Sequence, residues 1–518
     1  MGQSISFHKT AHGYGHIQRD QPCEDASSSF SDENGHYHIA VVSDGHGQAR
    51  SFRSAVGSKV AVDVTVDCLK ELAEGILSSP EEENAFYREL LESLRDRILR
   101  IRQLTDTILS RWYAGIQADY AENPPTPEEL GEFAQYYEDD KHIPEIYGAT
   151  LIAALRLPGC LVLLHQGDGR CDVFYGDGSV DQPIPWDERC QGAKTSSLCE
   201  EGAYETIRHC VIDLEKASVI ACYLGSDGVE DAYRDQEGTH IFYKHLSCLL
   251  TERTPEEFDA FLEEFLPDFS AHGFCSNSGS LDDVSVAGIV DPEAILAWKD
   301  SYAAQIRRFE LEEKLIYKDR AHKSMIRKHT YLEEHLREAE EKYNAFREEL
   351  VRLQKISEQF PEQKKTLEEQ LLEYEPKLAE MAKSFAIMEA YITLVERKDD
   401  PLPRLRWAYA RCKKSVLEAV KAVRDEEYRK LKARQQQLLD RKALLEEQEA
   451  KTREQLAACE DAMRAQAEVS DQAKQAYEEY HRRFCQAEQA VQDIQQQIDA
   501  LCTEPAPVPF ASEDEKTE

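Results

Sequence analysis

Glycine is absent from the last 230 residues of this 518-residue chain, because all 24 glycines lie at or before Gly288. A compact domain with many turns needs glycine, whereas a long helix excludes it. The distribution therefore predicts two architectures, a folded domain over residues 1–295 and a helical extension after it.

The sequence also lacks long apolar runs, an excess of positive charge and closely paired cysteines. No stretch approaches the ~18 uninterrupted apolar residues of a membrane span, and residues 1–10 lack the apolar region of a secretory signal. The formal net charge of −37 disfavours nucleic acid as a partner, because phosphate binding needs a basic surface. None of the 14 cysteines forms a CxxC pair, which favours reduced thiols. We expect a cytoplasmic protein with no membrane and no nucleic-acid partner.

Short β-branched runs bounded by Gly, Asp or Ser recur through the first part of the chain. They span residues 38–47, 150–157, 160–170, 171–178, 209–214, 218–228 and 282–291. Several are continuously apolar, as strands buried on both faces should be. Two helical stretches, 51–76 and about 80–120, interrupt them without a regular βαβ alternation. This order predicts a layered α+β sandwich.

Acidic residues recur at the ends of these runs, and glycine follows three of them. The acidic positions are Glu24–Asp25, Asp44, Asp168, Asp227 and Asp282–Asp283. Carboxylates gathered in one cleft repel one another unless divalent cations neutralise them. Ligation by oxygen alone favours a hard ion, Mg²⁺ or Mn²⁺. The pattern therefore predicts a metal site at one end of the strands.

Six short segments carry a more specific signal. They are CEDA (23–26), VVSDGHG (41–47), YGAT (147–150), GDGR (167–170), GSDGVED (225–231) and LDDVSVAGIV (281–290). In this order and spacing they resemble the metal-dependent serine/threonine phosphatases of the protein phosphatase 2C family, in a bacterial-type branch. The resemblance covers residues 8–292. It implies a four-layer sandwich, two antiparallel β-sheets flanked by helices, with a binuclear Mn²⁺ or Mg²⁺ centre at one end.

The resemblance also implies roles for individual residues. Asp44 would bridge both metal ions, and the carbonyl of Gly45 would bind one of them. Asp227 and Asp282 would be direct ligands, and Glu24 would hold the centre through water.

Three further positions match the family. Asp168 and Asp231 correspond to acids that help to bind a third, more weakly held ion in some members. His46 corresponds to the acid that assists departure of the serine or threonine alkoxide. The alternatives are that Asp168 and Asp231 are surface acids, and that His46 is a structural histidine held by its turn.

The sequence departs from the family at the phosphate-binding arginine. Many members carry that arginine four residues before the first acidic residue, where this chain has Asp20, and Arg19 is displaced by one position. An arginine grips a phosphate through two parallel hydrogen bonds. We expect Arg19, His16 or a metal ion to bind the substrate phosphate instead. Asp283 stands where the family commonly has Asn.

The helical part contains an apolar repeat in steps of four and three from Leu332 to Val395, which predicts a coiled coil. Pro361 and Pro376 should kink it. The strongest helix stop, at residues 398–403, separates arms of equal length, 300–398 and 404–502. Equal arms predict an antiparallel hairpin that turns near 399–403. A parallel dimer with a kink there is the alternative.

These observations predict a catalytic domain over 1–295, a coiled-coil hairpin over 296–502 and a disordered acidic tail over 503–518. The expected function is metal-dependent hydrolysis of phosphoserine and phosphothreonine in phosphoproteins, by attack of a metal-activated water. The coiled coil would bind a protein partner or regulate the enzyme. The alternative is a catalytically weak or inactive scaffold or phosphoprotein reader that acts through the coiled coil.

Overall fold

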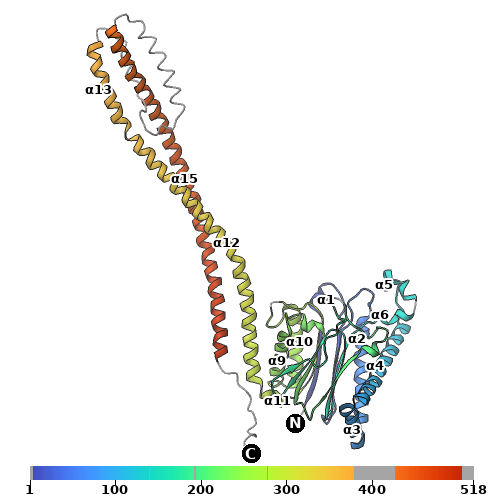
Figure 1. Cartoon of the computed structure of the whole chain (residues 1–518). Coiled ribbons are helices and arrows are strands. Elements are labelled where there is room, and N and C mark those ends of the chain that lie inside the picture. Colours follow the sequence, from blue (N-terminus) through green and yellow to red (C-terminus); the bar gives the residue numbers. More distant parts are fainter. Residues whose placement is uncertain (1–3, 139, 192–193, 277, 379–425, 504–518) are drawn as a thin grey trace, which may run out of the picture. The chain divides into compact units, whose positions relative to one another are not determined.

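The computed structural model describes residues 4–138, 140–191, 194–276, 278–378 and 426–503 (Figure 1). They divide into two compact units, one up to Lys318 together with residues from Val491 on, the other Asp319–Ala490. None of the helices in these ranges is long and apolar enough to cross a membrane.

The first unit contains two five-stranded antiparallel sheets, which confirms the expected α+β sandwich. One sheet has the order β1 (Ile5–Ala11), β10 (Val284–Val290), β9 (Val219–Gly225), β6 (Arg170–Tyr175) and β7 (Val180–Asp181). The other has the order β2 (Ala26–Ser31), β3 (His38–Ser43), β4 (Leu151–Arg156), β5 (Cys160–Gln166) and β8 (Arg208–Asp213).

Helices cover the outer faces of both sheets (Figure 1). On the β3 side, α2 (Ser54–Ile76) and α4 (Leu94–Glu122) bury Val62 and Trp112 against the sheet. On the β9 side, α9 (Gln236–Leu250) and α10 (Pro255–His272) bury Phe242 and Phe269. Apolar side chains such as Leu163 fill the space between the sheets. The result is four layers, because each sheet buries one face on its helices and the other on its partner sheet.

Short helices complete the first unit. They are α1 (Tyr14–Gln18), α3 (Pro80–Tyr87), α5 (Pro127–Leu130), α6 (Ile143–Ile146), α7 (Ala203–Thr206), α8 (Asp227–Glu230) and α11 (Pro292–Leu296). The single helix expected over 80–120 is interrupted by a π-turn at Arg88–Glu92. The Ser93 side chain then accepts the backbone N–H of Asp96 and begins α4 anew.

The helical extension consists of α12 (Lys299–Ser357), α13 (Phe360–Leu378) and α15 (Glu426–Thr503). The break before α13 lies next to Pro361, where a kink was expected, whereas Pro376 lies inside α13. In the second unit, Gln466 donates to the carbonyl of Ala339, and Cys459 donates to that of Phe346. The residue numbers of the contacts decrease along α15 as they increase along α12, so the two helices are antiparallel. The predicted turn at 399–403 and residues 504–518 of the tail lie outside the described residues.

Candidate metal centre

The acidic strand ends surround one cavity of about 280 Å³ in the first unit. Its polar lining consists of His16, Glu24, Asp44, His46, Gln48, Asp168, Thr195, Asp227, Asp282 and Asp283. Carboxylates from six positions in five separate chain segments therefore face a single space.

Three of these carboxylates lie especially close together. Asp44, Asp168 and Asp227 each place an oxygen within 4.8 Å of the others. Burial raises the pKa of Asp44 well above its ordinary value, and the neighbouring charge of Asp227 raises it further. Burial, followed by the charge of Asp168, raises the pKa of Asp227 to about 7. The raised pKa values mean that nearby positive charges do not neutralise these carboxylates.

One oxygen of this cluster also lacks a protein donor. Asp168 Oδ1 is buried and has no hydrogen-bond partner among the described residues. An unpaired buried carboxylate oxygen is costly, whereas a bound cation would both pair and neutralise it. A hard divalent ion with oxygen ligands fits this donor set.

The YGAT segment holds the loop that carries Asp44. The backbone N–H of Asp44 donates to the Thr150 hydroxyl at 2.9 Å, and Gly45 pairs with Ala149 in an isolated β-bridge. A Cβ atom at Gly148 would lie 2.5 Å from Cδ2 of His46, so a larger residue there would displace the His46 ring. Two motifs about a hundred residues apart thus form one supporting structure.

Asp227 follows β9 directly and begins the single-turn helix α8. The backbone N–H of Ser226 donates to the carbonyl of Ser285, and the N–H of Ser285 donates to the Ser226 hydroxyl, both at 3.0 Å. A Cβ atom at Gly228 would lie 2.0 Å from the carbonyl oxygen of Asp283. The GSDG and LDD segments are therefore locked together behind the cavity.

Glu24 is fixed from the start of α2. Its Oε1 accepts a hydrogen bond from the Ser54 hydroxyl at 2.7 Å, and its carbonyl accepts one from the Ser58 hydroxyl at 2.5 Å. Burial raises the pKa of Glu24. Asp25, which sequence analysis placed in the acidic pattern but gave no role, has a buried Oδ2 without a partner among the described residues. Burial and the charge of Asp283 raise the pKa of Asp25 well above its ordinary value.

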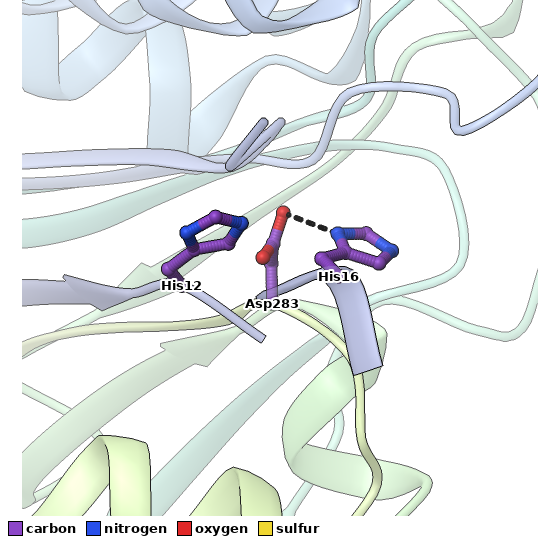
Figure 2. Close-up of side chains that lie close together, drawn as sticks. All are labelled: His12, His16 and Asp283. Carbon is purple, nitrogen blue, oxygen red and sulfur yellow. Dashed lines mark ion pairs between the residues drawn. The ribbon is translucent and has the colours of Figure 1, made fainter. Parts of the chain in front are cut away.

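His12, His16 and Asp283 form a second cluster beside the cavity (Figure 2). Asp283 Oδ1 accepts the backbone N–H of Gly13 at 2.6 Å, and Oδ2 accepts that of Glu24 at 2.7 Å. His16 Nδ1 lies 3.1 Å from the same Oδ2. Both oxygens of Asp283 therefore already bind backbone donors, so this carboxylate supports the fold of the neighbouring loops.

The remaining predicted site residues differ in whether they line the cavity. His16 lines the cavity, and its Nε2 lies 3.2 Å from Asp282 Oδ1. His46 lines the cavity as well. Asp231 is not among the lining residues. Burial raises the pKa of Asp231, and the charges of Asp282 and Asp168 raise it further. Arg19 is exposed, and its Nε donates to Gln21 Oε1 at 2.5 Å.

Among the described residues, neither arginine nor lysine lines this cavity. A second cavity of about 410 Å³ adjoins it and shares His46, Gln48 and Thr195. Arg50 and Lys194 line that second cavity together with three glutamates, Glu145, Glu200 and Glu201. The cationic side chains of the adjoining cavity therefore lie beside the acidic cluster and not within it.

Comparison with known proteins places this domain in a family. Residues 12–266 match the model of the family described as Protein phosphatase 2C. No curated protein sequence matches the chain.

Several solved structures are similar to the chain. The phosphatase Stp1 from Staphylococcus aureus has 18% identity and a TM-score of 0.30, with 56% of this chain and 95% of that chain covered. The Mycobacterium tuberculosis phosphatase PstP/Ppp has 16% identity and a TM-score of 0.32, with 55% and 98% covered. PppA, a regulatory component of the T6SS in Pseudomonas aeruginosa, has 13% identity and a TM-score of 0.33, with 55% and 97% covered.

The family match includes the CEDA, DGHG, YGAT, GDGR and GSDGVED segments, and the LDD segment follows just beyond it. Through residues 12–266, this chain belongs to the protein phosphatase 2C family of metal-dependent serine/threonine protein phosphatases.

Proposed function

We propose that this protein hydrolyses phosphoserine and phosphothreonine residues of phosphoproteins at a binuclear Mn²⁺ or Mg²⁺ centre in the 280 Å³ cavity. The observation that carries the proposal is the cluster of Asp44, Asp168 and Asp227, whose oxygens lie within 4.8 Å of one another. When bound there, two divalent ions would supply an activated water and positive charge for the phosphoryl oxygens.

The proposed ligand set is the one that the family resemblance implies, and the lining of the cavity supports it. Asp44, Asp227 and Asp282 present carboxylates to the cavity and would hold the ions, with the carbonyl of Gly45 beside them. Glu24 is held in place by Ser54 and would contact the centre through water. Asp168, with its unpartnered Oδ1, and Asp231 would hold a third, weaker ion.

His46 is proposed to protonate the leaving alkoxide. Burial lowers the pKa of His46, while the charge of Asp168 acts in the opposite direction. A bound phosphate dianion would favour the protonated imidazole, because a nearby opposite charge stabilises the charged form. The proton would then be available where the poor leaving group needs it.

His16 is proposed to help in binding the substrate phosphate, because it is the one predicted phosphate ligand that lines the cavity. Arg19 lies outside the lining and contacts Gln21. We further propose that polypeptide next to the phosphorylated residue occupies the adjoining cavity, where Arg50 and Lys194 can contact it.

The test is hydrolysis of a phosphothreonine peptide and of p-nitrophenyl phosphate by the full chain, with and without Mn²⁺. The wild type should be active only with metal, and Asp44→Asn should lose at least about two orders of magnitude. Asp67→Asn, which removes an exposed acid on α2, should be unaffected. A wild type that binds Mn²⁺ without hydrolysing either compound would refute the enzyme and support the phosphoprotein reader. That alternative is favoured by the lack of arginine and lysine among the described residues of the cavity.

A further inference from the structure

The first turns of α12 are part of the core of the phosphatase domain, although they lie beyond the family match, which ends at residue 266. Tyr302 is 1% exposed, and its ring centroid lies 6.3 Å from that of Phe174 in β6. Lys244 of α9 donates to the Gln305 side chain at 2.7 Å. The helical extension therefore begins as a firmly packed element of this domain.

The next turn of α12 contacts the segment that follows α8. The rings of Tyr233 and Phe309 pack edge to face, with centroids 6.4 Å apart. Arg234 forms an ion pair with Glu313, whose side chain is 9% exposed. Tyr233 and Arg234 come two and three residues after Asp231, and Asp227 begins the same segment.

The same turns of α12 also lie near the loop that leads to Asp282. Burial raises the pKa of Cys275 in this loop to about 12, and the charges of Glu310 and Lys314 on α12 act on the thiol as well. Residues 307–314 of α12 thus contact the segment that follows α8, and their charges act on the loop that leads to Asp282.

Other contacts hold the α8 segment besides those with α12: Val229 and Ala232 are buried in the core, and the Tyr233 ring also packs against Phe269. The α8 helix contains four residues, and its start is held by the two hydrogen bonds between Ser226 and Ser285. Glu230 pairs with Arg170 at 2.8 Å. The residues after the helix, Tyr233 and Arg234, contact Phe309 and Glu313 of α12. Because the carboxylates in the cavity repel one another, the position of this segment depends on such contacts.

We propose that Phe309 and Glu313 are positioning residues for Asp227 and Asp231, so that the helical extension sets the affinity of the centre for divalent ions. The proposal rests on the proposed function of the cavity as a metal site. It extends the site to residues outside the family match. Since α12 runs as one helix from Lys299 to Ser357, a protein partner that displaces this helix would change metal occupancy.

The test measures Mn²⁺ binding directly, by the electron paramagnetic resonance signal of free Mn²⁺, in full-length protein without substrate. Glu313→Gln and Phe309→Ala should each raise the dissociation constant of Mn²⁺ by about three- to tenfold. Glu312→Gln is the matched control, because Glu312 pairs with Arg308 within α12 at 2.8 Å. Its Mn²⁺ affinity should equal that of the wild type.

Two further measurements separate positioning from loss of fold. Arg234→Ala should weaken Mn²⁺ binding as much as Glu313→Gln, and the double variant should be no weaker than either single one. Thermal unfolding without metal shows whether each variant is folded. If Phe309→Ala is unfolded, the Mn²⁺ affinity of Glu313→Gln alone tests the proposal. Affinities of folded Glu313→Gln within twofold of the wild type would overturn this inference and leave the proposed function standing. A wild type that binds no Mn²⁺ would overturn both.

Discussion

Asp44 and Thr150 exchange two hydrogen bonds. The backbone N–H of Asp44 donates to the Thr150 hydroxyl at 2.9 Å, and the backbone N–H of Thr150 donates to the Asp44 carbonyl at 2.8 Å. The pair continues the β3–β4 ladder beyond its last regular residues. It fixes the backbone from which the Asp44 carboxylate enters the cavity.

Replacing the Thr150 hydroxyl should therefore weaken the site without changing its charge. Thr150→Val leaves the half-buried N–H of Asp44 without an acceptor, which should cost about 1 kcal/mol of unfolding free energy and weaken Mn²⁺ binding. Thr150→Ser keeps the hydroxyl and should retain most of both. Urea unfolding and Mn²⁺ titration measure the two effects. Equal behaviour of the valine and serine variants would show that the hydrogen bond has no role.

Asp283→Asn tests whether this carboxylate is a support. Its two oxygens accept the backbone N–H groups of Gly13 and Glu24, and the amide nitrogen of asparagine would meet one of these donors. Although asparagine is common here in the family, we expect a loss of about 1–3 kcal/mol in unfolding free energy. Asp268→Asn, at an exposed ion pair with His272, serves as the control and should change little. A fully stable Asp283→Asn protein would contradict the assignment.

Asp227→Asn should stabilise the metal-free protein and abolish its stabilisation by metal. Burial and the charge of Asp168 raise the pKa of Asp227 to about 7, so the folded state keeps this proton after the unfolded chain has lost it. The stability contribution of Asp227 is therefore full below about pH 4 and is lost as pH rises to about 7. At pH 8 the variant should gain on the order of 2 kcal/mol in EDTA. Thermal unfolding in EDTA and in Mn²⁺ checks both effects, and a destabilised variant in EDTA would refute the repulsion.

The role of His46 is testable with two leaving groups. A serine alkoxide needs a proton to depart, whereas nitrophenolate does not. His46→Ala should lower kcat for a phosphoserine peptide by about a hundredfold or more and that for p-nitrophenyl phosphate only a few-fold. His36→Ala, an exposed histidine in the β2–β3 turn, is the control. Equal losses on both compounds would remove the general-acid role.

Most acidic positions of the site were predictable because an acidic residue at the end of a strand has a recognisable local sequence pattern. Asp44, Asp168 and Asp227 follow apolar runs and precede glycine, and the structure brings all three together. The supporting contacts have no such local sequence pattern. The hydrogen bonds between Asp44 and Thr150, and the contact of His16 with Asp283, join residues far apart in the chain.

Secondary structure was missed where local propensity is weak or mixed. The serine-rich β2 was not predicted, because its strand state depends on pairing with β3, in which Ala26 lies opposite Ser43. The edge strand β1 was missed because its polar and apolar residues are mixed, and α9 and α10 were not predicted either. Their apolar faces become evident only against the aromatic core that contains Phe242 and Phe269.

Antiparallel pairing of the two long helices predicts a specific crosslink. Cys459 Sγ lies 3.5 Å from the carbonyl oxygen of Phe346, so position 459 lies against the backbone of position 346 across the pair. Phe346→Cys should form a covalent link with Cys459 within one chain when treated with a short bis-maleimide at low protein concentration. The product should run as a monomer of altered mobility on a denaturing gel, and mass spectrometry should identify the linked peptides.

The matched control is Arg347→Cys, one position along α12 and exposed, where a link to Cys459 should form far less readily. In a parallel dimer, residues 346 and 459 would lie far apart along the rod. The two introduced thiols of neighbouring chains would meet instead, and the reagent would give a covalent dimer. A dimer band specific to Phe346→Cys, without the intrachain product, would therefore refute the antiparallel hairpin.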